Sequence, residues 1–438
     1  MSYQSNFQAY LAAVKKPFEK VVRIDFLQPD EKSVAFSLGN KTARGYMRDY
    51  NTSAFIQSGT LNVSLQNGTR RTCSIKLANV DGAFDFAVNK VWFGDRIRLE
   101  MGIVLPDGTP FYIPQGVFVV KDPSTVYSPS ERSITYSLTD KFALLDGTMS
   151  GRLSYALQIP SAPGNRPKVF EIVSDLLKLS KYTMSATGDP AEYIDPAIPK
   201  FTNYFDGRTT TVTYLNGATE TVSYDAVTYD LALDNGSTLA DAIKELNTLL
   251  SCWYGYDAAG RFFFDPSQDE LTDTQKPLVW SFTEKDGEFF NFSENLNIND
   301  LTNNVVVCGN GLTYANYYGR AYNADPASPT NVNKIGLKTY YETSDNLCSE
   351  TQCKDYATFL LRRKMMIQSS VTITCGQLFH LRENALVSVK REDKGGETRQ
   401  YLINSYSLPL ADEGSMQISC SAATNDENFH ITTEGGLG

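Results

Sequence analysis

The stretch Ser237–Pro266, STLADAIKELNTLLSCWYGYDAAGRFFFDP, predicts a helix that runs into a two-stranded hairpin. Ser237 or Thr238 can cap the helix with a side-chain oxygen. Four apolar residues recur at helical spacing on one face: Leu239, Ile243, Leu246 and Leu250. Two short strands follow across a turn that contains a glycine: Cys252–Tyr256 and Arg261–Phe264. We expect Leu246 to face this hairpin around Trp253 and Phe263, in an α/β region at the middle of the chain.

Strand patterns dominate on both sides of this region. Apolar and polar residues alternate from Val21 to about Leu145 and again from Val371 onward, which is typical of β-barrels or sandwiches. The expected fold class is therefore mainly β with an α/β middle part. We expect five parts in chain order: an N-terminal helix at 1–20, a first β-barrel at 21–160, α/β middle domains at 161–310, a loop and helix at 311–370, and a second β-barrel at 371–438 completed by strands from the preceding region.

More local patterns complete this outline. Asn216 and Gly217, within the stretch TTTVTYLNGATETVSY, predict a hairpin with a type I′ turn. Residues 310–345 are rich in Asn, Tyr and Gly, and we expect them to form a long loop. Further helices are expected at three places: residues 6–16, about 350–367, and a segment after residue 167 that turns Phe170, Val173, Leu176 and Leu177 inward.

The two β regions also echo each other. The first contains RIRLEMG, FYIPQGVFVV and SITYSLTD, and the second contains ALVSVKRE, QYLINSYSL and MQISCSAA in the same order. Inward residues of the first region correspond to those of the second: Ile97, Leu99 and Met101 to Val387 and Val389, and Ile134, Tyr136 and Leu138 to Met416, Ile418 and Cys420. Any two antiparallel meanders can share such a pattern, so a duplicated barrel and a chance likeness both remain open.

Composition argues against several classes of function. The 40 basic and 50 acidic residues give a net charge of −10, which disfavours gripping nucleic acid because phosphate contacts need clustered Lys and Arg. No apolar run approaches the ~20 residues of a membrane span, and the N-terminus lacks the pattern of a signal peptide. Seven scattered cysteines predict reduced, buried thiols. We expect no membrane span and no sequence-specific binding of nucleic acid.

No motif for catalysis, cofactor binding or metal binding emerges. Only two histidines are present, His380 and His430, and no nucleophile elbow or phosphate-binding loop occurs. Carboxylates that a glycosidase or a calcium loop could use are expected by chance among 50 acidic residues: Asp257 with Asp265, Glu284 with Asp286 and Glu288, and Asp269 with Glu270 and Asp273. A group of tyrosines could bind a sugar or a protein surface, and we favour assembly: Tyr314, Tyr317, Tyr318 and Tyr322. We expect no catalytic residue, cofactor or metal.

Three stretches resemble one known family, the baseplate hub or tail-associated proteins of tailed bacteriophages and phage-like injection machines. The first is GTLNVSLQNGTRRTCSIKLANVDGAFD with the strands up to SITYSLTDKFALLDG. The second is Ser237–Pro266 with the later LTNNVVVCGNG. The third is the helix TQCKDYATFLLRRKMM with QYLINSYSLPLADEGSMQISCSAA. The resemblance covers most of the chain. It implies two similar barrels joined by α/β middle domains, with three copies that close a ring of six barrels. Because the sequence stops at Gly438, soon after the second barrel, we expect no cell-wall-degrading region.

The resemblance implies a structural, non-enzymatic hub protein of the virion baseplate, assembled in the host cytoplasm. Such a protein adapts the six-fold tail tube to the tail tip and provides a channel for DNA ejection. The implied partners are further copies of the chain (a homotrimer), the tail tube or distal tail protein, and a tail-tip spike, fibre or tape measure protein. The alternative is a tail-tip carbohydrate-active enzyme (depolymerase) or a glycan-binding β protein.

Overall fold

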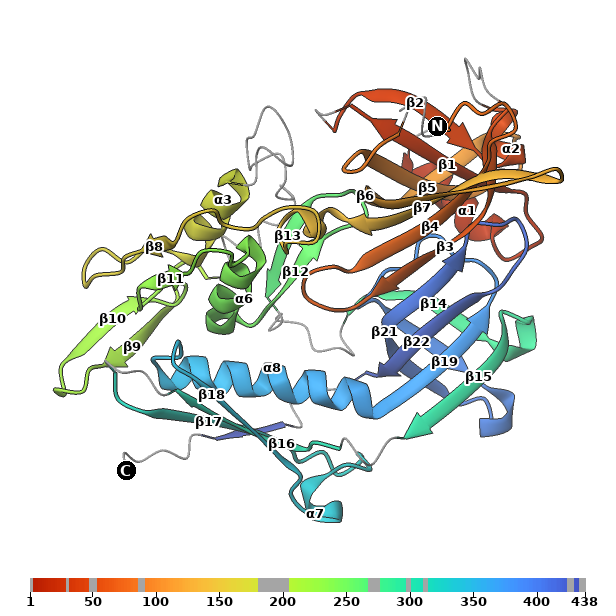
Figure 1. The fold of residues 1–438 in the computed structure, drawn as a ribbon. Coiled ribbons are helices and arrows are strands. Elements are labelled where there is room, and N and C mark those ends of the chain that lie inside the picture. Colours follow the sequence, from red (N-terminus) through yellow and green to blue (C-terminus); the bar gives the residue numbers. More distant parts are fainter. Residues whose placement is uncertain are drawn as a thin grey trace.

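A sheet of 13 strands dominates the chain, as the predicted mainly β fold requires (Figure 1). The computed structural model describes residues 3–28, 31–46, 53–85, 91–179, 205–266, 276–296, 301–309, 314–423 and 429–432. An N-terminal helix, α1 (Tyr3–Ala13), packs beside the sheet, and its Tyr10 is fully buried. This helix starts and ends about three residues earlier than the sequence pattern predicts.

The first half of the sheet contains the strands predicted between Val21 and Leu145, and a short helix, α2 (Lys41–Arg44). The strands are β1 (Lys20–Leu27), β2 (Val34–Gly39), β3 (Phe55–Ser64), β4 (Arg71–Ala78), β5 (Arg96–Val104), β6 (Pro110–Ser128) and β7 (Glu131–Asp140). They pair in the order β3-β4-β7-β6-β5-β1-β2, and every pair is antiparallel. A 3-10 turn, Lys141–Leu144, then leaves the sheet.

The second half of the sheet is built mainly from the C-terminal third of the chain. Its strands are β14 (Leu278–Thr283), β15 (Phe289–Leu296), β19 (Ser369–Cys375), β20 (Leu386–Lys390), β21 (Thr398–Pro409) and β22 (Met416–Ala422). They pair in the order β15-β19-β22-β21-β20-β14, and only the β14–β20 pair is parallel. Strands β14 and β15, which precede residue 371, therefore contribute to this half of the sheet.

The two halves share one topology, which confirms the predicted echo. We define the first repeat as β3, β4, β5, β6 and β7, and the second repeat as β15, β19, β20, β21 and β22. When the five strands of each repeat are numbered along the chain, both repeats have the same spatial order. The first strand pairs with the second, the second with the fifth, the fifth with the fourth, and the fourth with the third. The strand pairings also align the residues that the sequence matched. Leu138, in the fifth strand of the first repeat, and Cys420, in the fifth strand of the second repeat, occupy equivalent positions opposite the second strand of their own repeat.

Two β-bulges reinforce this equivalence. In the first repeat, β6 skips one residue between Val120 and Asp122 against β7, and in the second repeat β21 skips one between Ile403 and Ser405 against β22. Likewise, β3 is irregular between Ile56 and Ser58, and β15 is irregular at the corresponding point, directly after Phe289. A bulge fixes which side chains face the core, so coincident bulges give both repeats the same inward positions.

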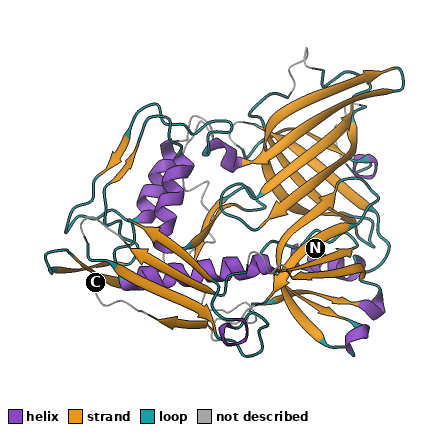
Figure 2. Cartoon of the chain, turned by 60° about the horizontal axis from the view of Figure 1, so that its bottom comes forward, coloured by secondary structure: helices purple, strands orange, loops and turns teal. Residues whose placement is uncertain are grey.

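The repeats join edge to edge within the chain. Strand β21 pairs antiparallel with β3, from Ser405 opposite Ser64 to Pro409 opposite Thr60. One hydrophobic core continues across this junction and includes residues of both repeats and of α1. Figure 2 shows the strands of the large sheet on the right of the view with short helices beside them, and the longer helices at the centre and left.

A middle region between the repeats contains the predicted helices and hairpins. Its elements are β8 (Leu157–Ile159), α3 (Val169–Leu179), β9 (Thr209–Thr213), β10 (Thr219–Ser223), β11 (Leu231–Leu233), α6 (Leu239–Leu250), β12 (Cys252–Tyr256) and β13 (Phe262–Pro266). Thr238 caps α6 in a capping box with Asp241, and the predicted apolar face of this helix is buried. The helix–hairpin prediction is confirmed.

Two details of the middle region differ from prediction. Leu246 is fully buried, but it shares its core with Tyr254 and Phe264 rather than with Trp253 and Phe263. Successive residues of a strand point to opposite faces, and Trp253 packs instead against Phe359 of a distant helix. The turn of the β9–β10 hairpin is not type I′, because only its glycine adopts a positive φ (81°) and the loop closes with three residues.

The expectation of a long loop at 310–345 is wrong for the part of that range that the structure describes. Two strands, β17 (Tyr317–Asn323) and β18 (Thr339–Ser344), and a short helix, α7 (Val332–Ile335), form there. The two strands join β16 (Asn304–Gly309) and β23 (Phe429–Thr432) in one sheet. Helix α8 (Glu350–Gln368), which the sequence predicted, packs on this sheet (Figure 1). A Cβ on Gly319 would lie 2.2 Å from the Cys353 backbone, so glycine is required where β17 meets α8.

Candidate functional site

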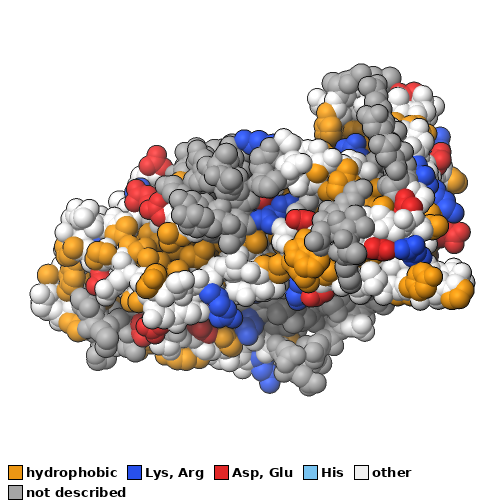
Figure 3. All heavy atoms as spheres, turned by 45° about the horizontal axis from the view of Figure 1, so that its top comes forward, with side chains coloured by type: hydrophobic (Ala, Val, Ile, Leu, Met, Phe, Trp, Pro, Cys, Tyr) orange, Lys and Arg blue, Asp and Glu red, His pale blue; other side chains and the backbone are white. Residues whose placement is uncertain are grey.

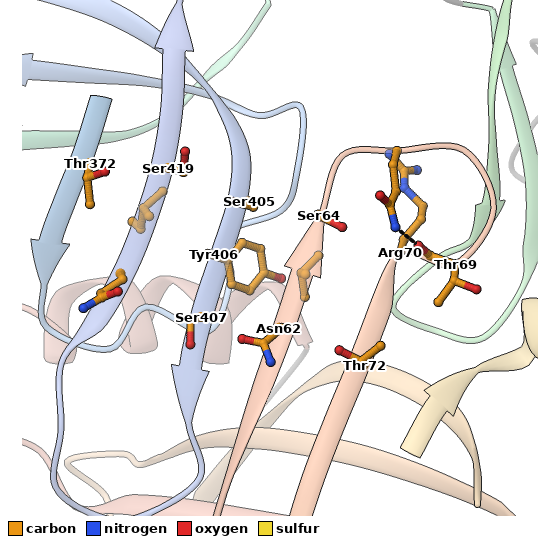
Figure 4. A pocket seen from close by; sticks show the side chains of 14 residues that line it. Asn62, Ser64, Thr69, Arg70, Thr72, Thr372, Ser405, Tyr406, Ser407 and Ser419 are labelled. Atoms are coloured by element: carbon orange, nitrogen blue, oxygen red, sulfur yellow. Dashed lines mark hydrogen bonds between the residues drawn. The ribbon is translucent and has the colours of Figure 1, made fainter. Parts of the chain in front are cut away.

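A polar groove crosses the junction between the two repeats. It has a volume of about 400 Å³, and 14 residues line it: Asn62, Val63, Ser64, Gln66, Thr69, Arg70, Thr72, Thr372, Ser405, Tyr406, Ser407, Gln417, Ile418 and Ser419. Figure 4 shows that most of them lie on neighbouring strands of both repeats, whereas Thr69 and Arg70 lie in the loop between β3 and β4. We call this set the junction groove.

The alternation of side chains along each strand explains why the groove is polar. On β22, Met416 and Ile418 are buried in the core, whereas Gln417 and Ser419 face the other side of the sheet. The same alternation places Asn62 on β3 and Thr72 on β4 away from the core. The exposed face of the junction is therefore covered by short, uncharged polar side chains.

Charge is almost absent from the junction groove. Arg70 is the one charged residue among those that line it, although the whole chain carries a net charge of −10. Its guanidinium group lies 4.7 Å from the ring centroid of Phe263 and 3.6 Å from a carboxylate oxygen of Glu383. The acidic residues of the chain thus lie outside the groove lining, and Figure 3 shows charged groups of both signs scattered over one face of the molecule.

Beneath one end of the groove, a buried ion pair holds three regions together. Arg71 of β4 donates two hydrogen bonds to Glu383, at 2.8 and 2.7 Å, and one to the Tyr256 carbonyl at 2.7 Å. Burial alone would raise the pKa of Glu383, but Arg71 and Arg70 hold it below its usual value. This pair connects the first repeat, the β19–β20 loop of the second repeat and the middle region.

Asp140 supports the same end of the groove. One carboxylate oxygen accepts hydrogen bonds from the backbone N–H groups of Arg70 and Arg71, at 2.7 and 3.0 Å. The other oxygen accepts from the N–H of Phe142 at 3.1 Å. Burial raises the pKa of Asp140 to about 6 in spite of these hydrogen bonds. Asp140 therefore fixes the path of the chain where β4 begins, and its role is structural.

The side chains that the sequence singled out for other chemistry have structural partners. Asp257 forms an ion pair with Arg261 at 3.0 Å, and Glu288 forms one with Lys15 at 2.8 Å. Nδ1 of His380 lies 3.0 Å from the buried Tyr10 hydroxyl. Tyr314 is buried and donates a hydrogen bond to the Thr228 carbonyl.

The remaining candidate residues from the sequence either lie outside the described residues or are not grouped as metal ligands. Asp269, Glu270 and Asp273 lie outside the described residues. His430 lies on β23, in the sheet beneath α8. Within the described ranges, no group of three or more His, Cys, Asp or Glu side chains could hold a metal ion. All seven cysteines are buried and form no disulfide bond, as the sequence predicted for thiols. Within the same ranges, no helix has both the length and the apolar character needed to cross a membrane.

The sequence did not predict the junction groove. A signal was present in the polar positions of the strands, since Ser, Thr, Asn and Gln alternate with core residues in TLNVS, SYSL and MQIS. Such alternation shows that one face of a strand is polar, but it does not show that β3 and β21 lie side by side. That adjacency joins residues more than 340 positions apart, from Ser64 to Ser405.

Two comparisons of the sequence with known proteins gave no match: no family model and no curated protein matches this chain. Solved structures do match. A tail protein from Neisseria meningitidis MC58 covers 92% of this chain and 97% of its own length, with a TM-score of 0.53 at 10% identity. The 43 kDa tail protein of prophage MuSo2 from Shewanella oneidensis covers 92% of this chain and 98% of its own length, with a TM-score of 0.53 at 12% identity. The chain therefore has the fold of phage tail proteins.

Proposed function

We propose that this chain is a structural hub protein at the distal end of a phage or phage-like tail, located in the virion. Three copies would close a ring in which the first repeats (within 21–160) and the second repeats (within 371–438) alternate. The observation that supports this most is the repeated five-strand topology with both bulges conserved. Two equivalent repeats in each of three chains present six equivalent positions, which suits a part that must meet a six-fold tube.

The polar face described at the junction groove suits the wall of the central channel. Its equivalent in the first repeat is also mainly uncharged and polar, because Ser124, Thr135 and Ser137 occupy the positions of Ser407, Gln417 and Ser419. Asp122, at the position of Ser405, is the charged exception among these matched positions. Short uncharged side chains neither bind phosphates by releasing counterions nor bury apolar surface. The low density of charge on this wall, rather than the net charge of the whole chain, would let DNA pass.

Charge added to the groove tests this role. The variant Asn62→Lys/Ser407→Lys/Gln417→Lys should assemble normally but eject DNA more slowly, and more slowly still at low salt, because each lysine adds a phosphate contact. A control with the same added charge places lysine at exposed sites outside the groove: Tyr155→Lys/Leu215→Lys/Leu337→Lys. Equal ejection by the two variants would contradict the channel assignment. Electron microscopy of the particle should place three copies on the tail axis, and a chain off the axis would refute the hub.

The rival function is a carbohydrate-active enzyme or a glycan-binding protein. Glycoside hydrolysis needs two carboxylates that flank the bond to be cleaved, and none of the described residues that line the junction groove is a carboxylate. We therefore expect the purified chain to release no reducing ends from the host polysaccharide. Turnover that a single carboxylate substitution abolished would favour the enzyme.

A further inference from the structure

Each repeat leaves one strand edge unpaired among the described residues. Strand β15 ends the sheet and pairs only with β19. Beyond Val120, β6 pairs with β7 on one side, and its other edge has no partner strand in the described part of the chain. Both segments are largely exposed, and Tyr127 and Phe290 are 80% and 69% exposed. Exposed edges of this length can template the addition of another strand.

The junction inside the chain shows how such edges can pair. There the second half of β21 pairs with β3, after the first half of β21 has paired with β20. The first repeat contains β6 as the equivalent of β21, and the second repeat contains β15 as the equivalent of β3. The first half of β6 pairs with β5, and the second half is the free edge described above. The chain therefore contains one completed junction and the two unpaired halves of a second one.

We propose that β15 of one copy adds to the free half of β6 of the next copy, in the register of the β3–β21 junction. This inference rests on the proposed ring, and it identifies the contact that closes the ring. The bulges set the alignment, because Val120 and Ile403 precede equivalent bulges on β6 and β21, and Phe289 and Ile56 precede equivalent bulges on β15 and β3. The paired residues across the copies are then Pro123 with Leu296, Ser124 with Asn295, Thr125 with Glu294, and Val126 with Ser293.

The chemistry of these pairs is compatible with a shared ladder. No like charges lie opposite one another, and the one ionised side chain, Glu294, faces Thr125. The junction bonds from Leu65 N–H to the Asn404 carbonyl (2.6 Å) and from Leu410 N–H to the Gly59 carbonyl (2.9 Å) set the alternation of hydrogen-bonded pairs. In that alternation, Thr125 and Glu294 exchange two hydrogen bonds.

Pro123 takes the place of Tyr406 in this scheme. It lacks an N–H group, so the contact with Leu296 keeps one hydrogen bond instead of two. Prolines in sheets are found on edges, where the missing N–H does not interrupt a ladder, and they limit unspecific pairing of an exposed edge. The proline therefore suits an edge that stays single until the matching strand of another copy arrives.

Disulfide trapping tests the pairing and its register. The variant Ser124→Cys/Asn295→Cys places two thiols on directly opposed residues of a non-hydrogen-bonded pair, where Cβ atoms come close enough to bond. The variant Asn62→Cys/Ser407→Cys is the positive control, because these residues oppose each other within one chain. The variant Ser124→Cys/Glu294→Cys shifts the register by one residue and points the thiols to opposite faces. The native cysteines are all buried and should not interfere.

Mild oxidation of Ser124→Cys/Asn295→Cys should produce covalent dimers and trimers on non-reducing gels, with no larger species. The positive control should lose its two introduced thiols but stay at the mass of one chain, and the shifted variant should form no covalent oligomer. Light scattering on the untreated protein measures its oligomeric state, and this separates the hypothesis of a trimeric ring from the hypothesis of the β15–β6 contact. A trimer in which only the shifted variant, or neither variant, forms covalent oligomers would overturn the proposed contact and leave the ring standing. A chain that stays monomeric and forms no covalent oligomer would overturn both.

Discussion

Arg71 shows how one residue can hold distant parts of the chain together. Its guanidinium group is fully buried, with 2% of the side chain exposed, and it bonds to the second repeat through Glu383 and to the middle region through the Tyr256 carbonyl. A buried charge of this kind costs desolvation energy, so the pair contributes mainly by fixing which segments meet.

Removal of one partner should therefore cost more than removal of both. We expect Glu383→Gln to lower the free energy of unfolding by about 3–5 kcal/mol, because it leaves the Arg71 charge buried and unpaired. The double variant Arg71→Met/Glu383→Leu should recover much of that loss. Glu397→Gln, which breaks an exposed pair with Arg399, should cost less than about 1 kcal/mol. Urea unfolding measures all three, and equal losses in the single and double variants would contradict this account.

His380 should make stability depend on pH. Burial and nearby Arg382 lower the pKa of His380 to about 4 in the folded chain, whereas an unfolded histidine titrates near 6.5. Between these values the unfolded state binds more protons, so stability should be complete above pH 6.5 and should fall by ~3 kcal/mol as the pH drops to 4. The phenol of Tyr10 accepts a hydrogen bond from the Phe379 N–H and can donate its proton to the neutral imidazole, which favours the uncharged form.

Urea midpoints at pH 4–7 test this dependence. Other groups titrate in the same range, Asp140 among them with the opposite sign, so the informative quantity is the difference between wild type and His380→Phe. The variant should lose the part of the slope that His380 contributes. An unchanged slope would show that His380 is not the titrating group.

At the scale of elements, α6 offers the sharpest comparison. Leu246 is fully buried in the core of the middle region, whereas Lys244 on the same helix is exposed. Leu246→Asp should lower the free energy of unfolding by roughly 3 kcal/mol or more, because it buries an unpaired carboxylate. Lys244→Asp should change it by less than about 1 kcal/mol. Equal melting temperatures for the two variants would show that the predicted helix face is wrong.

Elements were predictable from the sequence where a single periodicity governed them. The helical spacing of Leu239, Ile243, Leu246 and Leu250 and the alternation in the two repeats are local signals, and the structure confirms the helix and the strands. Strand β17 was missed because Asn, Gly and Tyr dominate its composition, although its residues do alternate in burial. The junction groove could not be predicted, because it depends on an edge contact between β3 and β21 that no local pattern encodes.

At the scale of the whole molecule, the two repeats should open together. One core cluster contains residues of both repeats, including the equivalent residues Ile75 and Ile373, which are both fully buried. Val307 belongs to a separate cluster between α8 and the sheet formed by β16, β17, β18 and β23. Cooperative unfolding follows shared burial, so local stability should be linked across the junction but not with that second sheet.

Hydrogen exchange can detect this linkage. Ile75→Ala and Ile373→Ala should each cost about 2–5 kcal/mol, and each should speed amide exchange in both β4 and β19. Val307→Ala is the matched control, and it should speed exchange in β16 and α8 while leaving β4 unchanged. If each isoleucine variant affected only its own repeat, the repeats would be independent folding units.

The coincident bulges have a consequence for ancestry. A bulge cannot move along a strand by one residue without turning the following side chains to the wrong face, so it changes more slowly than the residues around it. The halves of this sheet have diverged in sequence but keep both bulges at matching points. Duplication and fusion of a gene that encoded one such repeat explain this correspondence, and in the proposed ring the product of that gene would have supplied six identical subunits. Fusion would have freed each repeat to vary separately, so that in the proposed ring different surfaces could meet three-fold and six-fold neighbours.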